Sequence, residues 1–281
     1  MTTRRGFVAG LAALAAVPAR AQPNPAPDVR FAVTGSMEQG SLALGQAPPG
    51  SIVALDGRPL QATPQGRFTF GFAYNQTAPS QVTVRYPDGR GDSRSFTPTI
   101  RQYDIQRVNG LPQATVTPSP EDAARINREA EEIFLARLAQ TGGSDFLAGL
   151  DWPAPGILSG VFGSQRINNG VPGSPHYGVD MAAPSGTPIR APADGVVSIS
   201  ADHFLSGGFT LLDHGQGVST SYLHQSQRLV RAGEIVRRGQ VIGHIGQTGR
   251  ATGPHLHWAM NWFQMRLDPS RSTRTPAPQP L

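Results

Sequence analysis

The segment GPHLHWAM, residues 253–260, carries the pattern on which the fold of the C-terminal half depends. Polar and apolar side chains alternate along it, which is the period of a β-strand. Side chains two residues apart project from the same face of a strand. A predicted strand from His255 to Trp262 therefore places His255 and His257 on one face.

Two further segments carry polar side chains that can join this pair. In PHYGVD, residues 175–180, the four-residue spacing predicts that His176 and Asp180 share a strand face. The run STSYLH ends in His224. These spacings would let all five side chains share one metal centre, in a chain without cysteine. Two histidines and one aspartate, with a fourth position left to water, are a ligand set typical of catalytic zinc.

The composition predicts a turn-rich β protein. The chain has 281 residues, of which 15% are charged, 33 are glycine and 26 are proline. This length has room for two domains, each with its own core. No uninterrupted apolar stretch reaches the 18 or so residues that a membrane span needs, so no integral membrane segment is expected in the mature chain.

The N-terminus has the pattern of an export signal. Arg4 and Arg5 precede an apolar run over residues 7–17, and the Ala-Arg-Ala sequence at 19–21 resembles a cleavage site with small residues at its ends. The paired arginines favour the twin-arginine type over residues 1–21, although an ordinary secretory signal would lead to the same compartment. A buried N-terminal helix is the alternative.

The charge balance argues against nucleic acid as a partner. All 24 basic residues are arginines, against 19 acidic residues, which gives a net charge of +5. Removal of residues 1–21 takes away three arginines, so 21 remain against 19 and the mature net charge is +2. No basic stripe with interleaved aromatic residues is present. A slight positive charge is compatible with an anionic cell wall.

The region before the histidines alternates between short strands and turns. Asp56-Gly57 is a strong hairpin signal, and Phe68, Phe70 and Phe72 are predicted to load one strand face. These features predict a small immunoglobulin-like sandwich. The predicted regions are a signal (1–21), a spacer (22–28), the β-sandwich (29–107), a helical linker (108–150), a C-terminal β domain with all seven histidines (151–269) and a disordered tail (270–281).

One amphipathic helix is expected in the linker. Ser119 is a plausible N-cap, Pro120 suits the first helical position, and Asp122 lies three residues after the cap. Helical spacing of apolar residues continues until Gly142-Gly143. The charged residues of this helix are interpreted as a solvated face, and a regulatory role remains open.

Three stretches resemble the lysostaphin-like (LytM-type) zinc metallopeptidases, which cut peptide cross-bridges of bacterial peptidoglycan. They are PHYGVDMAAPSGTPIRAPADGVV (175–197), LLDHGQGVSTSYLH (211–224) and AGEIVRRGQVIGHIGQTGRATGPHLHWAM (232–260). The resemblance covers roughly residues 153–263 and implies a C-terminal antiparallel β catalytic domain. Residues 40–72 also look like the N-terminal β domain of some exported members. The fold expected is mainly β, with a sandwich, one linker helix and this catalytic domain.

Carried over by position, the resemblance implies that one Zn²⁺ is bound by His176, Asp180 and His257. It makes His224 and His255 a catalytic pair beside the metal. One of the pair would take a proton from water and the other would stabilise the oxyanion or protonate the leaving amine. The sequence leaves this division of labour open.

Three other residues are weaker candidates for contact with substrate. Tyr222 alternates with His224, although a core or rim position is an equal alternative. Arg166 and Asn169 precede the first ligand and could meet substrate carboxylates or backbone. An ordinary loop role is the alternative for each of these two.

The function predicted is that of an exported zinc metalloendopeptidase acting on peptidoglycan. The signal favours a Gram-negative periplasm, where the resemblance implies cross-links between D-alanine and meso-diaminopimelate. The alternative is a non-catalytic module that activates or binds other wall hydrolases, and a regulatory protein partner is possible but unspecified. A biotinyl or lipoyl carrier is excluded, because the chain has no lysine to modify.

Overall fold

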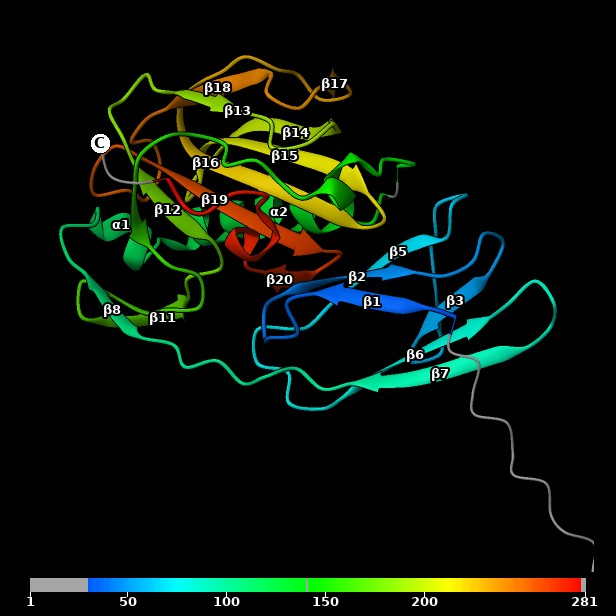
Figure 1. Ribbon diagram of the computed structural model, residues 1–281. Coiled ribbons are helices and arrows are strands. Elements are labelled where there is room, and N and C mark those ends of the chain that lie inside the picture. The colour runs from blue at the N-terminus through cyan, green and yellow to red at the C-terminus, as the bar shows by residue number, and fades with distance from the viewer. Residues whose placement is uncertain (1–29, 140, 279–281) are drawn as a thin grey trace, which may run out of the picture.

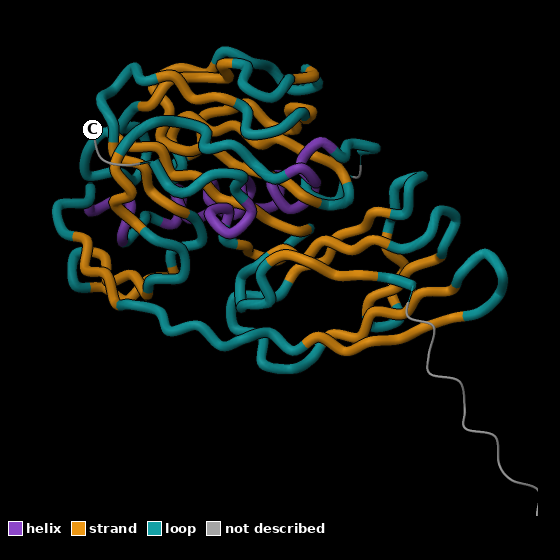
Figure 2. The backbone as a smooth tube through the Cα atoms, in the orientation of Figure 1, coloured by secondary structure: helices purple, strands orange, loops and turns teal. Residues whose placement is uncertain are grey.

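The computed structural model describes residues 30–139 and 141–278, and its elements are mainly strands (Figures 1 and 2). The predicted mainly-β class is therefore confirmed. Two β-rich regions are joined by a segment that carries the longest described helix (Figure 1). The predicted signal and spacer, residues 1–28, lie outside the described residues. No helix in the described part is long and apolar enough to cross a membrane.

The N-terminal region consists of two antiparallel sheets. One sheet has the order β1 (Ala32–Gly35), β2 (Leu42–Gln46), β5 (Arg67–Gly71). The other has the order β4 (Arg58–Leu60), β3 (Ile52–Leu55), β6 (Ser80–Arg85), β7 (Gly91–Phe96). The predicted hairpin at Asp56-Gly57 joins β3 to β4, and both residues have the positive φ that such a turn requires.

Aromatic side chains fill the space between these sheets. Phe68, Phe70 and Phe72 are fully buried, as their alternation predicts. The ring centroids of Phe70 and Phe96, from opposite sheets, lie 5.8 Å apart. The region is therefore a two-sheet sandwich with one core, while its immunoglobulin-like class stays a prediction.

The first strand of the linker pairs with the C-terminal region. β8 (Ile105–Val108) pairs in parallel with β10 (Gln165–Asn168), which pairs with β11 (Val171–Pro175). The domain boundary predicted at residue 107 therefore falls inside β8, which pairs with a strand of the C-terminal region. A short helix, α1 (Gln113–Val116), follows.

Helix α2 (Pro120–Ala136) begins as the sequence predicts, because the Ser119 hydroxyl accepts a hydrogen bond from the Asp122 N–H. The helix ends at Ala136, well before Gly142-Gly143. Ile133 and Ala136 pack against a small buried cluster on the large sheet, formed by Ile199, Phe209 and Leu211. The short 3₁₀ helix η1 (Asp145–Ala148) then leads into the large sheet.

The solvated-face interpretation holds for most charged residues of α2, but Glu129 departs from it. Glu129 accepts a hydrogen bond from the Phe204 N–H at 2.8 Å, and Glu132 lies 3.1 Å from Nε2 of His203. Arg137, the C-cap residue, is only 6% exposed. No residue within α2 itself is buried, so the helix keeps a solvated face.

A large sheet forms the C-terminal region. Its main path is β17 (Ile235–Val236), β14 (Gly195–His203), β15 (Gly207–Gly215), β16 (Val218–Arg228), β19 (His255–Trp262), β12 (Val179–Ala182), β9 (Ile157–Gly160). Three more strands join at its edges: β13 (Pro188–Arg190), β18 (Val241–Ile245), β20 (Met265–Leu267). The core buries one face of its centre, and α2 covers part of the other.

The register of this sheet aligns residues from three strands. His257 on β19 lies opposite Asp180 on β12 and opposite Leu223 on β16. Residues at paired positions of neighbouring strands project from the same face. His257, His255 and Asp180 therefore reach the side of the sheet that α2 covers in part.

The residues after the large sheet are ordered further than the sequence predicts. The 3₁₀ helix η2 (Pro269–Ser272) follows β20. Thr273 bridges to Leu150, and the Trp152 indole N–H donates to the carbonyl of Thr275 at 3.1 Å. An ion pair also joins Arg274 to Asp151. The predicted disordered tail from 270 is therefore corrected, because specific contacts hold residues 270–275.

Candidate active site

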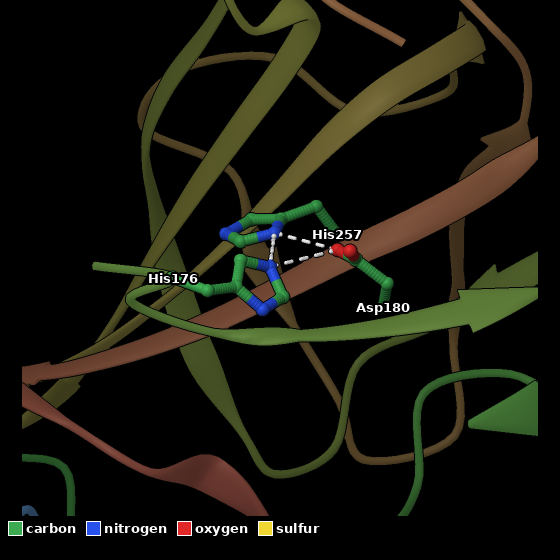
Figure 3. Close-up of side chains that lie close together, drawn as sticks. All are labelled: His176, Asp180 and His257. Atoms are coloured by element: carbon green, nitrogen blue, oxygen red, sulfur yellow. Dashed lines mark hydrogen bonds and ion pairs between the residues drawn. The ribbon is translucent and has the colours of Figure 1, made fainter. Parts of the chain in front are cut away.

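His176, Asp180 and His257 bring three ligand-type atoms together, and we call these residues the trio (Figure 3). His176 Nε2 lies 3.0 Å from Asp180 Oδ1 and 2.9 Å from His257 Nδ1. The third distance, between His257 Nδ1 and Asp180 Oδ1, is 2.8 Å. His176 and Asp180 are buried, and His257 is nearly so.

Different elements supply the trio. Asp180 and His257 come from the paired strands β12 and β19, as the register requires. His176 follows the end of β11, so it does not share a strand face with Asp180, and that prediction is wrong in its geometry. Backbone hydrogen bonds to Gly163 and Ser164 fix the residue, and the loop turns its ring toward Asp180.

Hydrogen bonding to backbone fixes the tautomer of His176. Its Nδ1–H donates to the carbonyl of Val161 at 3.0 Å, which leaves the Nε2 lone pair facing the trio. A carbonyl partner on the far nitrogen is the usual support for a metal-binding imidazole. Asp180 is oriented in the same way, because Arg166 Nη2 lies 2.6 Å from its outer oxygen, Oδ2.

The trio combines an anionic carboxylate with a neutral imidazole at His257. Burial alone would raise the pKa of Asp180, but the adjacent His176 and His257 hold that pKa well below its usual value. Burial lowers the pKa of His257 to about 4, against the opposing effect of Asp180. At neutral pH the imidazole lone pair is therefore free of a proton and can bind a metal.

The donor atoms of the trio fit zinc. Imidazole nitrogens and a carboxylate oxygen are common zinc ligands, with bonds of about 2.0–2.2 Å. A tetrahedral site with such bonds separates its ligand atoms by about 3.4 Å, so the trio would need to open by about half an ångström. One cation can bind all three converging ligand atoms at once.

A second pair of imidazoles lies beside the trio. The ring centroids of His224 and His255 are 4.7 Å apart, and His255 Nε2 lies 3.8 Å from Asp180 Oδ1. Each Nδ1–H donates to a backbone carbonyl at 2.8 Å, that of Thr248 for His224 and that of Gly253 for His255. Both Nε2 atoms are therefore left as potential proton acceptors. Burial lowers the pKa of His224 to about 3, assisted by the neighbouring histidines.

These five residues line one cleft of about 580 Å³. Its floor is the exposed side of β16, β19 and β12. Other parts of its lining come from α2, from the linker around Leu111 and from the loop between β18 and β19. The site is thus accessible to a ligand although its members are largely buried.

Comparison with known proteins identifies the family. The profile of peptidase family M23 matches residues 174–269. A crystal structure of a peptidase M23 from Pseudomonas aeruginosa superposes with a TM-score of 0.65 at 31% identity, over 84% of this chain and 94% of that one. This chain belongs to peptidase family M23. The predicted family resemblance and the C-terminal lysostaphin-like domain are confirmed.

Curated relatives of this M23 chain share only part of its length. Peptidoglycan DD-endopeptidase ShyA of Vibrio cholerae is 47% identical over 87 residues, which are 31% of this chain and 20% of the relative. DD-carboxypeptidase/endopeptidase Mpg of Neisseria meningitidis is 47% identical over 83 residues, 30% of this chain and 19% of the relative. The chain therefore spans about a fifth of the length of these relatives.

The M23 domain places Tyr222 away from its cleft, so the predicted substrate contact is wrong. The ring is fully buried on the opposite face of β16, and its hydroxyl lies 2.7 Å from Thr220 Oγ1. Thr220 in turn contacts Nε2 of His214 at 2.7 Å, and His214 Nδ1–H donates to the carbonyl of Asp194. Strand alternation cannot separate cleft from core when both faces of a strand are covered.

The other two substrate candidates differ in outcome. Asn169 does not line the cleft: its side chain forms hydrogen bonds to the backbone N–H and carbonyl of Leu111. It adopts a positive φ in the turn between β10 and β11, which corrects its predicted role. Arg166 lines the cleft beside Asp180, so a contact with substrate stays a prediction.

Two glycines shape the M23 site without a signal in the sequence pattern. A Cβ on Gly178 would lie 2.6 Å from His257 Nε2, and a Cβ on Gly160 would lie 2.5 Å from Asp180 Oδ2. Only glycine lets backbone approach the trio this closely. Gly178 lies between His176 and Asp180 in PHYGVD, so the sequence showed that it is close to two ligands. Its contact with His257 could not be read from the sequence.

Proposed function

We propose that this chain is a zinc endopeptidase that cleaves peptide cross-links of bacterial peptidoglycan. The observation that carries the proposal is the convergence of the trio beside two further histidines in one accessible cleft. Family M23 membership supports the same reaction class. His176, Asp180 and His257 would hold one Zn²⁺, with Arg166 orienting the carboxylate.

The metal would supply Lewis-acid chemistry, which acidifies a water molecule and polarises a peptide carbonyl. The chain's own groups handle the protons. His224 and His255 have Nδ1–H groups committed to backbone carbonyls and Nε2 atoms that can accept a proton. One would act as the base toward water, and the other would stabilise the oxyanion or protonate the leaving amine.

Two relatives support a substrate class for this chain. ShyA is a peptidoglycan DD-endopeptidase and Mpg a DD-carboxypeptidase/endopeptidase. We infer that this chain acts on the cross-link between D-alanine and meso-diaminopimelate. The export pattern over residues 1–21 supports a periplasmic location for the mature protein.

Digestion of purified sacculi with the 22–281 protein tests the proposal. Zinc-replete protein is expected to release muropeptides whose masses show hydrolysed cross-links, and chelation is expected to stop the release. His257→Ala protein is the negative control. Bound zinc without any released fragment would favour the non-catalytic alternative, in which the chain activates or binds another wall hydrolase.

A further inference from the structure

Arg137 is a buried cation that faces the cleft. It caps the C-terminus of α2, lines the same cleft as the trio and is only 6% exposed. Its Nε has no hydrogen-bond partner, and no carboxylate among the described residues forms an ion pair with it. A buried guanidinium normally has a hydrogen-bonding or anionic partner.

Arg266 brings a second cation to the same end of the cleft. It lies on β20 opposite Asn261 of β19, on the strand face that carries His257 and Ala259. Position 261 lies four positions along β19 from His257, so the backbone of Arg266 stands about 13 Å along the floor from that of His257. Its guanidinium lies 5.6 Å from the ring centroid of Tyr177.

Charge in the cleft is unbalanced at this end. Four arginines line the cleft and Asp180 is its single lining carboxylate among the described residues. Asp180 pairs with Arg166, while Arg250 donates to the carbonyl of Thr115. Burial lowers the pKa of Arg137, and the charge of Arg266 lowers it further. A bound anion would relieve the repulsion between the two arginines and offset the cost of burying Arg137.

We propose that Arg137 and Arg266 form a subsite for a carboxylate of the substrate peptide. The inference rests on the proposed function and extends it by assigning an acidic peptide to this end of the cleft. Meso-diaminopimelate has two carboxyl groups, so a cross-linked residue can retain a free one. A planar guanidinium binds a carboxylate through two parallel hydrogen bonds, which gives direction as well as charge.

The test uses a soluble cross-linked peptide with a free diaminopimelate carboxylate and the same peptide with that group amidated. Binding to chelator-treated protein is measured by calorimetry, and hydrolysis by zinc-replete protein is measured separately. The acid is expected to bind at least about tenfold more tightly than the amide, the range of one charge-assisted hydrogen bond. In hydrolysis, the acid and the amidated peptide should differ in KM rather than in kcat.

Arg137→Gln and Arg266→Gln should each abolish the preference for the acid, whereas Arg137→Lys should retain part of it. Arg58→Gln, on an exposed strand of the sandwich, removes the same charge and should change nothing. Circular dichroism identifies any variant that fails to fold, and the two positions report independently. Equal binding of acid and amide by the unaltered protein, or an equal loss in Arg58→Gln, would overturn the subsite.

The two proposals fail in different ways. Preferential binding of the acid without hydrolysis would leave the subsite in place and contradict the endopeptidase. Hydrolysis of both peptides with the same KM would support the endopeptidase and refute the subsite.

Discussion

His257 contacts both other members of the trio. Comparing a variant without His257 with a variant without His224 therefore separates metal binding from proton transfer. His257→Ala should lose both zinc and hydrolysis, because two ligands cannot hold the ion as three do. His224→Ala should keep about one zinc per chain and lose about 10²–10⁴-fold in rate. Elemental analysis beside turnover measures both. A zinc-free His224→Ala protein would contradict the assignment.

Gly178 is the residue whose lack of a side chain the trio needs most. In Gly178→Ala the new Cβ would meet His257 Nε2 at 2.6 Å and the carbonyl of Trp258 at 2.7 Å. The ring must then move, and we expect zinc affinity to fall by about 10–100-fold, as for other losses of support around a ligand. A competitive chelator titration measures the affinity.

Gly142 provides the matched control for that substitution. Nothing lies within 4 Å of a Cβ built there, and its φ is not positive. Gly142→Ala should bind zinc as the unaltered chain does. An equal loss of zinc in both variants would show that the glycine contact is not the cause.

At the scale of elements, an aromatic cluster connects the sandwich to the loop that carries His176. Tyr74 stacks on Tyr103 at 4.5 Å and meets the Tyr177 ring edge-on at 5.6 Å. The Tyr74 hydroxyl donates to the carbonyl of Gly163, whose N–H donates to the carbonyl of His176. The N-terminal region thus supports one ligand of the trio.

Tyr74→Ala should therefore lower both stability and zinc affinity. The loss of several aromatic contacts should reduce the free energy of unfolding by about 2–4 kcal/mol. Denaturant titration and chelator competition measure the two effects. Tyr86→Ala, in the core of the sandwich, should destabilise without changing zinc affinity. Equal zinc affinities for the Tyr74 variant and the unaltered chain would refute this coupling.

At the scale of the whole molecule, the buried His214 makes stability depend on pH. Burial lowers its pKa in the folded state, while the nearby carboxylates of Asp213 and Asp145 oppose the shift. The unfolded chain binds a proton below about pH 6.5, where the folded His214 resists it. Its contribution is therefore complete above that pH and is lost as the pH falls.

The free energy of unfolding of metal-free protein should decrease from pH 7 to pH 5, by up to about 1.4 kcal/mol per pH unit for each such group. His224 and His257 add to the same trend. His214→Asn should reduce the slope of the free energy of unfolding against pH by up to the amount that one bound proton contributes. Urea titrations at pH 7, 6 and 5 measure it, and an unchanged slope in the variant would exclude His214 as a source.

The sequence by itself determined the features that depend on short-range periodicity. The period of two placed His255 and His257 on one face of β19, and the bounds of β19 agree with those predicted. The cap at Ser119 placed the start of α2. The histidine motifs, together with the family resemblance, predicted the members of the trio and of the histidine pair from the sequence alone.

Only the tertiary structure decided which side of each element faces the cleft. Tyr222 and Leu223 point to opposite faces of β16, and both faces are covered, so alternation could not choose between core and cleft. His176 reaches Asp180 from a loop rather than a strand, and Arg137 turns inward where α2 ends early. These outcomes depend on contacts between distant segments, which local spacing does not encode.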